Sequence, residues 1–218
     1  MLFATDKSKH DKFSGYNELL AAFKLDGCAI CQIVKSSSQK YIESLLFEKI
    51  TEAQTIQKIR SSYGFCAAHS QLLIKTGDAL GNSLIFKGVL LELLNNLYHS
   101  NLDKFSKRSG CLACAAAEKE VERTANIFYH FYKEDEFICE FQKSNGLCLN
   151  HFLFIYNKLD DETLKDKLAK FHIEKIKYLI GHLDELIRKH DSQFTGEKIS
   201  PDETKAWLKA IKFTSGIT

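Results

Sequence analysis

The chain has 218 residues, which is enough for one sizeable domain or two small ones. Hydrophobic residues make up 44% of it and include 16 Phe, so the composition excludes a disordered chain. The 30 basic residues nearly balance 28 acidic ones, and the resulting net charge of +2 does not demand a polyanionic partner. One Pro and 11 Gly are few helix breakers for this length, which favours an all-α fold.

The chain shows no targeting or membrane signal. Its first residues lack the apolar core of a signal peptide, and the most apolar stretch, residues 83–94, contains Lys87 and Glu92. We therefore expect a cytoplasmic protein with no membrane partner. In a reducing compartment, seven Cys favour metal ligands or redox thiols over disulfides.

The most informative feature is a duplicated motif. A Cys-x-x-Cys followed by a Cys-x-x-His occurs twice, with 34 residues between the two motifs in the first copy and 33 in the second. Such close register predicts two similar halves. The candidate ligands are Cys28, Cys31, Cys66 and His69 in the first copy and Cys111, Cys114, Cys148 and His151 in the second.

The expected elements, in chain order, begin with a polar, flexible leader at residues 1–12. Residues 13–99 are expected to form the first helical metal-binding repeat, and its last helix, residues 80–98, is apolar on nearly every side, which predicts burial. The polar, basic residues 100–110 are expected to form a linker.

The same plan recurs in residues 111–191, the second helical metal-binding repeat, with helices expected at 111–132, 137–141, 148–156 and 162–190. Residues 192–218 are a tail with one short helix. Ser200, Pro201 and Glu203 supply an N-cap, a Pro at the first helical position and a capping-box Glu. We expect Trp207 of this helix to dock on the body.

Each motif places two ligands on one side of a helix start, because positions three apart are neighbours on a helix. Two facing motifs would supply three thiolates and one imidazole, a tetrahedral set found in structural zinc sites. Glycines that would let the backbone turn closely around a metal precede the ligands: Gly27, Gly64, Gly110 and Gly146. We predict two Zn²⁺ ions, with two iron–sulfur clusters as the alternative, for which four thiolates are the norm although His ligation is known.

Other interpretations fit less well. Buried thiols are common in cores, but eight candidates in matching register argue against packing alone. Dithiol redox chemistry lacks its usual strand–helix context, and Gln32 and Ala115 stand where a c-type haem motif needs His. A catalytic zinc keeps one position open, whereas this set fills all four.

The ligands could pair within each repeat or across the repeats. Loop-closure entropy changes by only about 0.6 kcal/mol per doubling of loop length, so it cannot decide whether Cys28 and Cys31 meet His69 or His151. The matching spacing favours closure within each repeat, and this is our expectation. Cys139 falls outside the pattern and is expected in the core.

No other side chain forms a recognisable site. The remaining histidines lack partners at ligand spacing and are expected to be surface or satisfied core residues: His10, His99, His130, His172, His182 and His190. Three basic residues within 104–108 are a weak signal for nucleic acid. The sequence contains no Gly-rich phosphate loop, nucleophile elbow or His-Glu-x-x-His motif.

The motif order resembles an uncharacterised prokaryotic family, a domain of unknown function. The resemblance rests on Gly-Cys-x-x-Cys, Gly-Phe-Cys-x-x-His, the Gly-Asp-Ala-Leu-Gly turn at residues 77–81 and the repetition of both ligand pairs. The order of motifs ends near residues 183–191, Leu-Asp-Glu-Leu-Ile-Arg-Lys-His-Asp. It covers nearly the whole chain and implies no activity, substrate or partner. Family members have Pro after the first Cys, where Ala29 and Leu112 stand here; this loosens the turn and leaves the ligands intact.

Together these patterns predict an all-α protein of two tandem pseudo-symmetric helical repeats, packed into one body and each pinned by a site of three Cys and one His. The leading hypothesis is a zinc-stabilised interaction or regulatory module that binds a protein partner. An iron–sulfur protein for electron transfer or redox sensing is the alternative. A third hypothesis, a metal-dependent enzyme, requires that one of the two sites keeps a coordination position free for a water or substrate.

Overall fold

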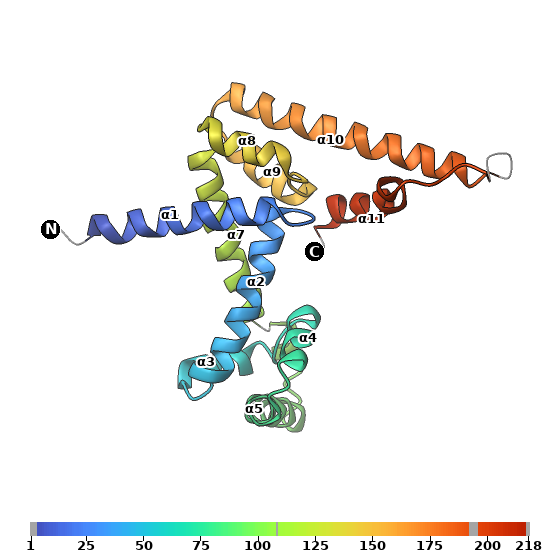
Figure 1. Cartoon of the computed structure of the whole chain (residues 1–218). Helices are drawn as coiled ribbons and strands as arrows, with labels where there is room; N and C mark the ends of the chain where they lie inside the picture. Colours follow the sequence, from blue (N-terminus) through green and yellow to red (C-terminus); the bar gives the residue numbers. More distant parts are fainter. Residues whose placement is uncertain (1–3, 108, 192–195, 217–218) are drawn as a thin grey trace. The chain divides into compact units, whose positions relative to one another are not determined.

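The computed structural model describes residues 4–107, 109–191 and 196–216, and side chains from residue 14 onward. All regular elements in these ranges are helices, which confirms the all-α prediction (Figure 1). Contacts divide the chain into two compact units. Unit 1 comprises Met1–Ile33 and Glu122–Thr218, and unit 2 comprises Val34–Val121. None of the described helices has the length and apolar character needed to cross a membrane.

The helices recur in the same order in both copies of the motif. The first copy contains α2 (Ala29–Ser44), a π-helical turn η1 (Leu45–Lys49), α3 (Ala53–Ser61), α4 (Ala67–Thr76) and α5 (Ala79–Tyr98). The second contains α7 (Leu112–Phe131), α8 (Asp135–Lys143), α9 (Leu149–Lys158) and α10 (Glu162–Lys189). Outside them lie α6 (Asp103–Ser106) and two helices that Figure 1 labels, α1 (Ala4–Phe23) and α11 (Pro201–Ser215).

Helix starts repeat in detail between the copies. Cys66 is the N-cap of α4 with φ −67° and ψ 164°, and Cys148 is the N-cap of α9 with φ −67° and ψ 163°. The carboxylate of Asp78 accepts the N–H of Gly81 at the start of α5, and Asp161 caps α10 in the same way. The duplicated motif therefore corresponds to duplicated helices.

Two helices lie in the segments expected at the edges of the repeats. α1 includes residues 4–12 of the expected leader, and the expected linker at residues 100–110 contains α6. The boundaries between the two units fall inside α2 and α7 and so do not mark the ends of the expected repeats. The repeat bounds of 13–99 and 111–191 therefore stay a prediction from the sequence.

α11 begins with the predicted capping box: Ser200 Oγ accepts the N–H of Glu203, whose carboxylate accepts the N–H of Ser200. The expected docking of Trp207 is wrong, since this side chain is 52% exposed. Glu203 and Ala206 form the buried face instead, because Glu203 turns inward to pair with Lys189 of α10.

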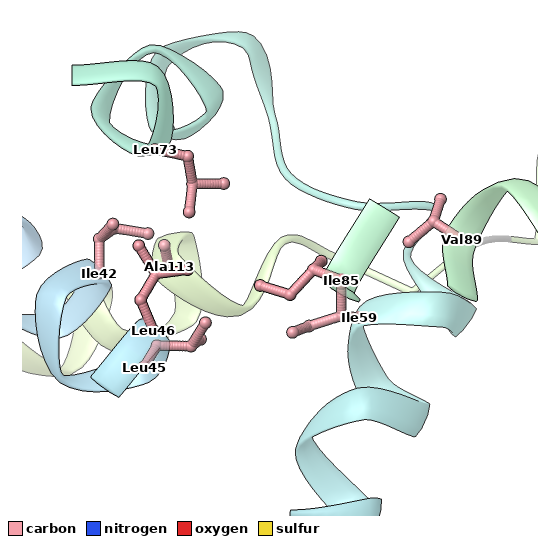
Figure 2. Packing of buried hydrophobic residues seen from close by; sticks show 8 residues of the cluster. All are labelled: Ile42, Leu45, Leu46, Ile59, Leu73, Ile85, Val89 and Ala113. Carbon is pink, nitrogen blue, oxygen red and sulfur yellow. The ribbon is translucent and has the colours of Figure 1, made fainter. Parts of the chain in front are cut away.

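The core of unit 2 is aliphatic. Figure 2 shows Leu73 of α4 pointing toward Ile42 of α2, with Ile59 of α3 near Ile85 of α5. The full buried cluster is Ile42, Leu45, Leu46, Ile59, Leu73, Ile85, Val89 and Ala113. These side chains hold α4 and the start of α7 in one unit.

The prediction that α5 is buried all round is wrong. Ile85 and Val89 lie on its buried face, but several of its leucines are about half exposed or more: Leu80, Leu84, Leu90, Leu91, Leu94 and Leu97. The physical reason is that α5 packs on α3 and η1 with one face. Its composition is more apolar than that one-sided packing requires.

The core of unit 1 is aromatic. The ring of Phe128 in α7 lies 5.4 Å from Phe137 and 5.0 Å from Phe141, both in α8. Phe23, at the end of α1, lies 5.4 Å from Phe141, near the end of α8. These edge-to-face contacts place the ends of α1 and α8 side by side.

Candidate metal centres

Four candidate ligands meet in unit 1. Centre 1 consists of Cys28, Cys31, Cys148 and His151, whose ligand atoms all lie within 4.8 Å of one another. His151 Nδ1 is 3.4 Å from the Sγ of Cys28, 3.2 Å from that of Cys31 and 3.3 Å from that of Cys148. The Sγ atoms of Cys31 and Cys148 are 3.6 Å apart.

The other four meet in unit 2. Centre 2 consists of Cys66, His69, Cys111 and Cys114, also within 4.8 Å of one another. His69 Nδ1 lies 3.1 Å from Cys66 Sγ, 3.7 Å from Cys111 Sγ and 3.4 Å from Cys114 Sγ. The Cys66 and Cys114 sulfurs are 3.6 Å apart. All eight candidates from the sequence thus fall into two groups of three thiols and one imidazole.

The expected pairing within each repeat is wrong. The Cys-x-x-Cys of the first copy meets the Cys-x-x-His of the second in centre 1, and the reverse combination forms centre 2. In unit 1 the reason lies in the aromatic core. Phe23 and Phe141 hold the ends of α1 and α8 together. The end of α1 is followed within a few residues by Cys28, and the end of α8 by Cys148.

In unit 2, hydrogen bonds bring the Cys-x-x-His of the first copy and the Cys-x-x-Cys of the second copy close together. The N–H of Ser109 donates to the carbonyl oxygen of Ser61 at 3.1 Å, and their hydroxyls are also 3.1 Å apart. Ser61 ends α3 and leads to Cys66, whereas Ser109 leads to Cys111. The two ligand pairs of centre 2 therefore start from neighbouring points of the backbone.

The glycines before the ligands behave as expected at three of the four positions. Gly27, Gly64 and Gly146 have φ of 91°, 98° and 81°, in the left-handed region that other residues rarely adopt. Gly110 does not lie in that region.

The spacing fits one tetrahedral ion in each centre. With Zn–S bonds of about 2.3 Å, tetrahedral geometry separates two thiolates by about 3.8 Å and a thiolate from an imidazole nitrogen by about 3.6 Å. One Sγ···Sγ distance of 3.6 Å in each centre and the Sγ···Nδ1 distances of 3.1–3.7 Å lie close to these values, and all ligand atoms lie within 4.8 Å of one another. The donor set and its geometry therefore fit metal binding.

Centre 1 stabilises one thiolate at a helix N-terminus. Hydrogen bonds from Cys28 and Cys31, together with His151, hold the pKa of Cys148 far below its usual range. Hydrogen bonding to Cys148 and Cys28, with burial, raises the pKa of Cys31. Burial opposes the charged imidazole, but contact with Cys148 and Cys28 raises the pKa of His151 to about 9.

Centre 2 follows the same pattern more weakly. Burial opposes ionisation of Cys66, but the backbone N–H of His69 and the thiol of Cys114 lower its pKa. Burial and the neighbouring thiol of Cys66 raise the pKa of Cys114 to about 12, and burial lowers the pKa of His69. A metal must displace the protons that remain, so binding releases protons and weakens at low pH.

The two centres differ in the solvent exposure of their candidate ligands. Cys28, Cys31 and Cys148 are 5%, 9% and 1% exposed, whereas every ligand of centre 2 is partly exposed. Gly216, at the end of α11, lies against centre 1, since a Cβ built there would be 3.2 Å from Cys148 Sγ. The tail that lies outside both repeats thus covers one centre.

The cysteine and histidine residues outside the centres have other surroundings. Cys139 is exposed, which corrects the expectation of a core position; the buried face of α8 is taken by Phe137 and Phe141. His172 is a satisfied core residue, as expected, and is 3% exposed. Its hydrogen bond beside centre 1 had no signal in the sequence, because it joins positions 25 residues apart.

Comparison with known proteins shows the family to which the chain belongs. A family of unknown function, DUF6062, matches residues 18–107 and again residues 99–217. The chain belongs to this family. Each DUF6062 match contains one Cys-x-x-Cys and one Cys-x-x-His, so the resemblance to an uncharacterised family with a duplicated motif is confirmed.

One curated relative is similar over almost its full length. The chain is 25% identical over 202 residues to an uncharacterised 23.9 kDa protein in the xynA 3' region of Caldicellulosiruptor sp. (strain Rt8B.4). This similarity covers 91% of the present chain and 99% of the relative. No solved structure matches this member of DUF6062.

Proposed function

We propose that this DUF6062 protein binds two Zn²⁺ ions, one in each centre. The observation that carries the proposal is the close approach of three sulfurs and one nitrogen, all within 4.8 Å, in both centres. A polynuclear iron–sulfur cluster distributes its protein ligands over several irons and so needs ligand atoms farther apart than one ion does. The short spacing therefore favours a single ion over the cluster alternative.

The ions would be structural. Four protein ligands complete a tetrahedral zinc and leave no position for a reacting water. Each centre joins chain segments from both copies of the repeat, so the free energy of metal binding would add directly to folding stability.

The role that this scaffold supports best is an interaction or regulatory module with a protein partner, in the reducing cytoplasm. Seven free thiols suit such a compartment. The exposed leucines of α5, including Leu90 at 62% and Leu91 at 55%, supply apolar surface for a partner.

The zinc proposal is tested by metal analysis of the full chain, purified without oxygen or added metal. We expect two zinc per chain in the wild type, and one in Cys66→Ala and in Cys148→Ala. Cys139→Ala is the matched control and should keep two, because Cys139 is exposed and belongs to neither centre. Iron with matching sulfide, or iron alone at both centres, would refute the zinc assignment.

The interaction role is tested separately by co-purification from the native cell. Leu90→Lys with Leu91→Lys should abolish recovery of a partner and leave the metal content at the wild-type value. Lys205→Ala, at an exposed position of α11, is the control. Partner recovery that is unchanged in the leucine variant, or absent in the wild type, would contradict this role.

A further inference from the structure

A cavity of about 80 Å³ lies in unit 1 beside centre 1. Two metal ligands, Cys28 and Cys148, form part of its lining together with the apolar side chains of Leu179 and Phe213. Three lysines line it as well: Lys175, Lys209 and Lys212. An apolar cavity with a few convergent polar groups is the usual form of a small-molecule site.

Two of these lysines already have partners. Lys209 lies 3.1 Å from a carboxylate oxygen of Asp202, and Lys212 lies 2.7 Å from one of Asp26. Among the residues that the structure describes, Lys175 has no carboxylate within salt-bridge distance. Its ammonium lies over the ring of Phe171, 5.2 Å from the ring centroid.

The position of Lys175 is electrostatically unfavourable as it stands. Burial, and then the charge of Lys209, lower the pKa of Lys175, so both its surroundings and its neighbour disfavour the charged form. An anion in the cavity would offset both effects, because it would give the ammonium a charged hydrogen-bond partner. Among the described residues, the structure thus leaves the Lys175 ammonium at the cavity without a carboxylate partner.

We propose that this cavity binds the carboxylate or phosphate group of a small anionic molecule, with Lys175 as the main contact and Lys209 in support. The apolar part of the molecule would pack on Leu179 and Phe213. This site is distinct from the metal centres in function, and the inference does not depend on which metal centre 1 holds.

The competing explanation is that Lys175 only balances the negative thiolates of centre 1. The two explanations predict different behaviour for Lys175→Met, which keeps much of the side-chain length and removes the charge. Loss of anion binding with unchanged metal content supports a ligand site. Loss of metal from centre 1 with unchanged anion binding refutes it.

The experiment is calorimetric titration of the metal-loaded full chain with inorganic phosphate and, separately, with propionate, at constant ionic strength. Saturable binding of phosphate alone assigns the cavity to phosphoryl compounds, and binding of propionate assigns it to carboxylates; either supports the proposal. We expect Lys175→Met to weaken binding by about tenfold or more, because it removes a charged hydrogen bond. Lys175→Arg should retain binding.

Lys177→Met is the matched control. This lysine is on the same helix, is exposed and pairs with Glu174 at 2.9 Å, and it does not line the cavity. Its variant should bind the anions as the wild type does. Equal weakening in Lys177→Met and Lys175→Met, or no saturable binding of either anion to the wild type, would overturn the proposal.

Discussion

The backbone N–H of Leu147 donates to Nε2 of His172 at 3.1 Å, one residue before the candidate ligand Cys148. His172 Nδ1 lies 2.8 Å from the carbonyl oxygen of Leu168, so the proton resides on Nδ1 and Nε2 is free to accept. Burial lowers the pKa of His172, which keeps the ring in the neutral form that this arrangement requires. α10 thereby holds the backbone that leads into centre 1.

His172→Phe should destabilise the protein and weaken metal binding at centre 1. The variant preserves an aromatic ring but leaves the buried N–H of Leu147 without an acceptor, which costs about 1–3 kcal/mol. Urea unfolding of the metal-loaded protein measures the stability, and metal retention by Cys66→Ala in the His172→Phe background measures centre 1 alone.

His130→Phe is the control, because His130 is exposed on α7 and such changes usually fall within about 0.5 kcal/mol. An equal loss of stability in both variants would show that the hydrogen bond to Leu147 has no special part in stabilising centre 1.

Gly216→Ala should weaken centre 1 and leave centre 2 unchanged. Gly216 has a φ of 73°, and an added Cβ would lie 3.2 Å from Cys148 Sγ and 3.4 Å from Cys31 Sγ. Both the backbone conformation and the contact oppose a side chain at this position. Metal affinity is measured by competition with a chromophoric chelator.

Gly181→Ala provides the comparison. An added Cβ at Gly181 of α10 meets no atom within 4 Å, and Ala is the better helix former by about 1 kcal/mol. This variant should keep its metal affinity and gain stability. A Gly216→Ala protein with wild-type affinity at both centres would contradict the proposed cover by α11.

Excess chelator should remove metal in two phases, with centre 2 first. The ligands of centre 2 are partly exposed, whereas the three Cys of centre 1 are at most 9% exposed. Cys66→Ala should lack the fast phase and Cys148→Ala the slow phase. If each single variant instead loses both metal equivalents, the two centres are not independent.

The Glu203–Lys189 pair should make stability depend on acid pH. Lys189 Nζ lies 2.8 and 2.9 Å from the two carboxylate oxygens, and its hydrogen bonding lowers the pKa of Glu203. Because the folded pKa lies below the unfolded value of about 4.3, the contribution is complete above that value and is lost as the pH falls through the folded pKa.

Glu203→Gln should therefore lower stability at neutral pH and reduce its decline in acid, as measured by thermal unfolding from pH 7 to pH 3. Glu174→Gln is the control, since its pair with Lys177 is about 70% exposed and contributes little. Identical pH profiles for Glu203→Gln and the wild type would refute this account.

Much of the local structure was predictable because its causes are local. Gly77 ends α4 in the left-handed conformation that Gly adopts most readily, and Ser200 and Glu203 form the capping box that their spacing indicates. The ligand types followed from the motif alone. A three-residue step at a helix start brings Cys66 and His69 together whatever the rest of the chain does.

Which motifs pair with each other depends on packing between distant parts of the chain. The spacing of the motifs along the sequence does not reveal this packing. Both copies offer the same ligands at nearly the same separation, so either combination satisfies a tetrahedral ion. The choice depends on Phe23 lying against Phe141 and on Ser109 bonding to Ser61. The exposure of Trp207 and Cys139 likewise depends on which neighbour occupies the buried face of each helix.

The pairing across copies also fixes the order in which the ligands become available during synthesis. Centre 2 uses residues 66–114, a stretch nested inside the interval from 28 to 151 that centre 1 requires. A ribosome releases a complete inner set as soon as Cys114 emerges, while Cys28 and Cys31 wait for His151. If the centres bind metal as proposed, a nascent chain can load centre 2 first, and a chain whose translation halts between Cys114 and His151 keeps Cys28 and Cys31 without the other two ligands of centre 1.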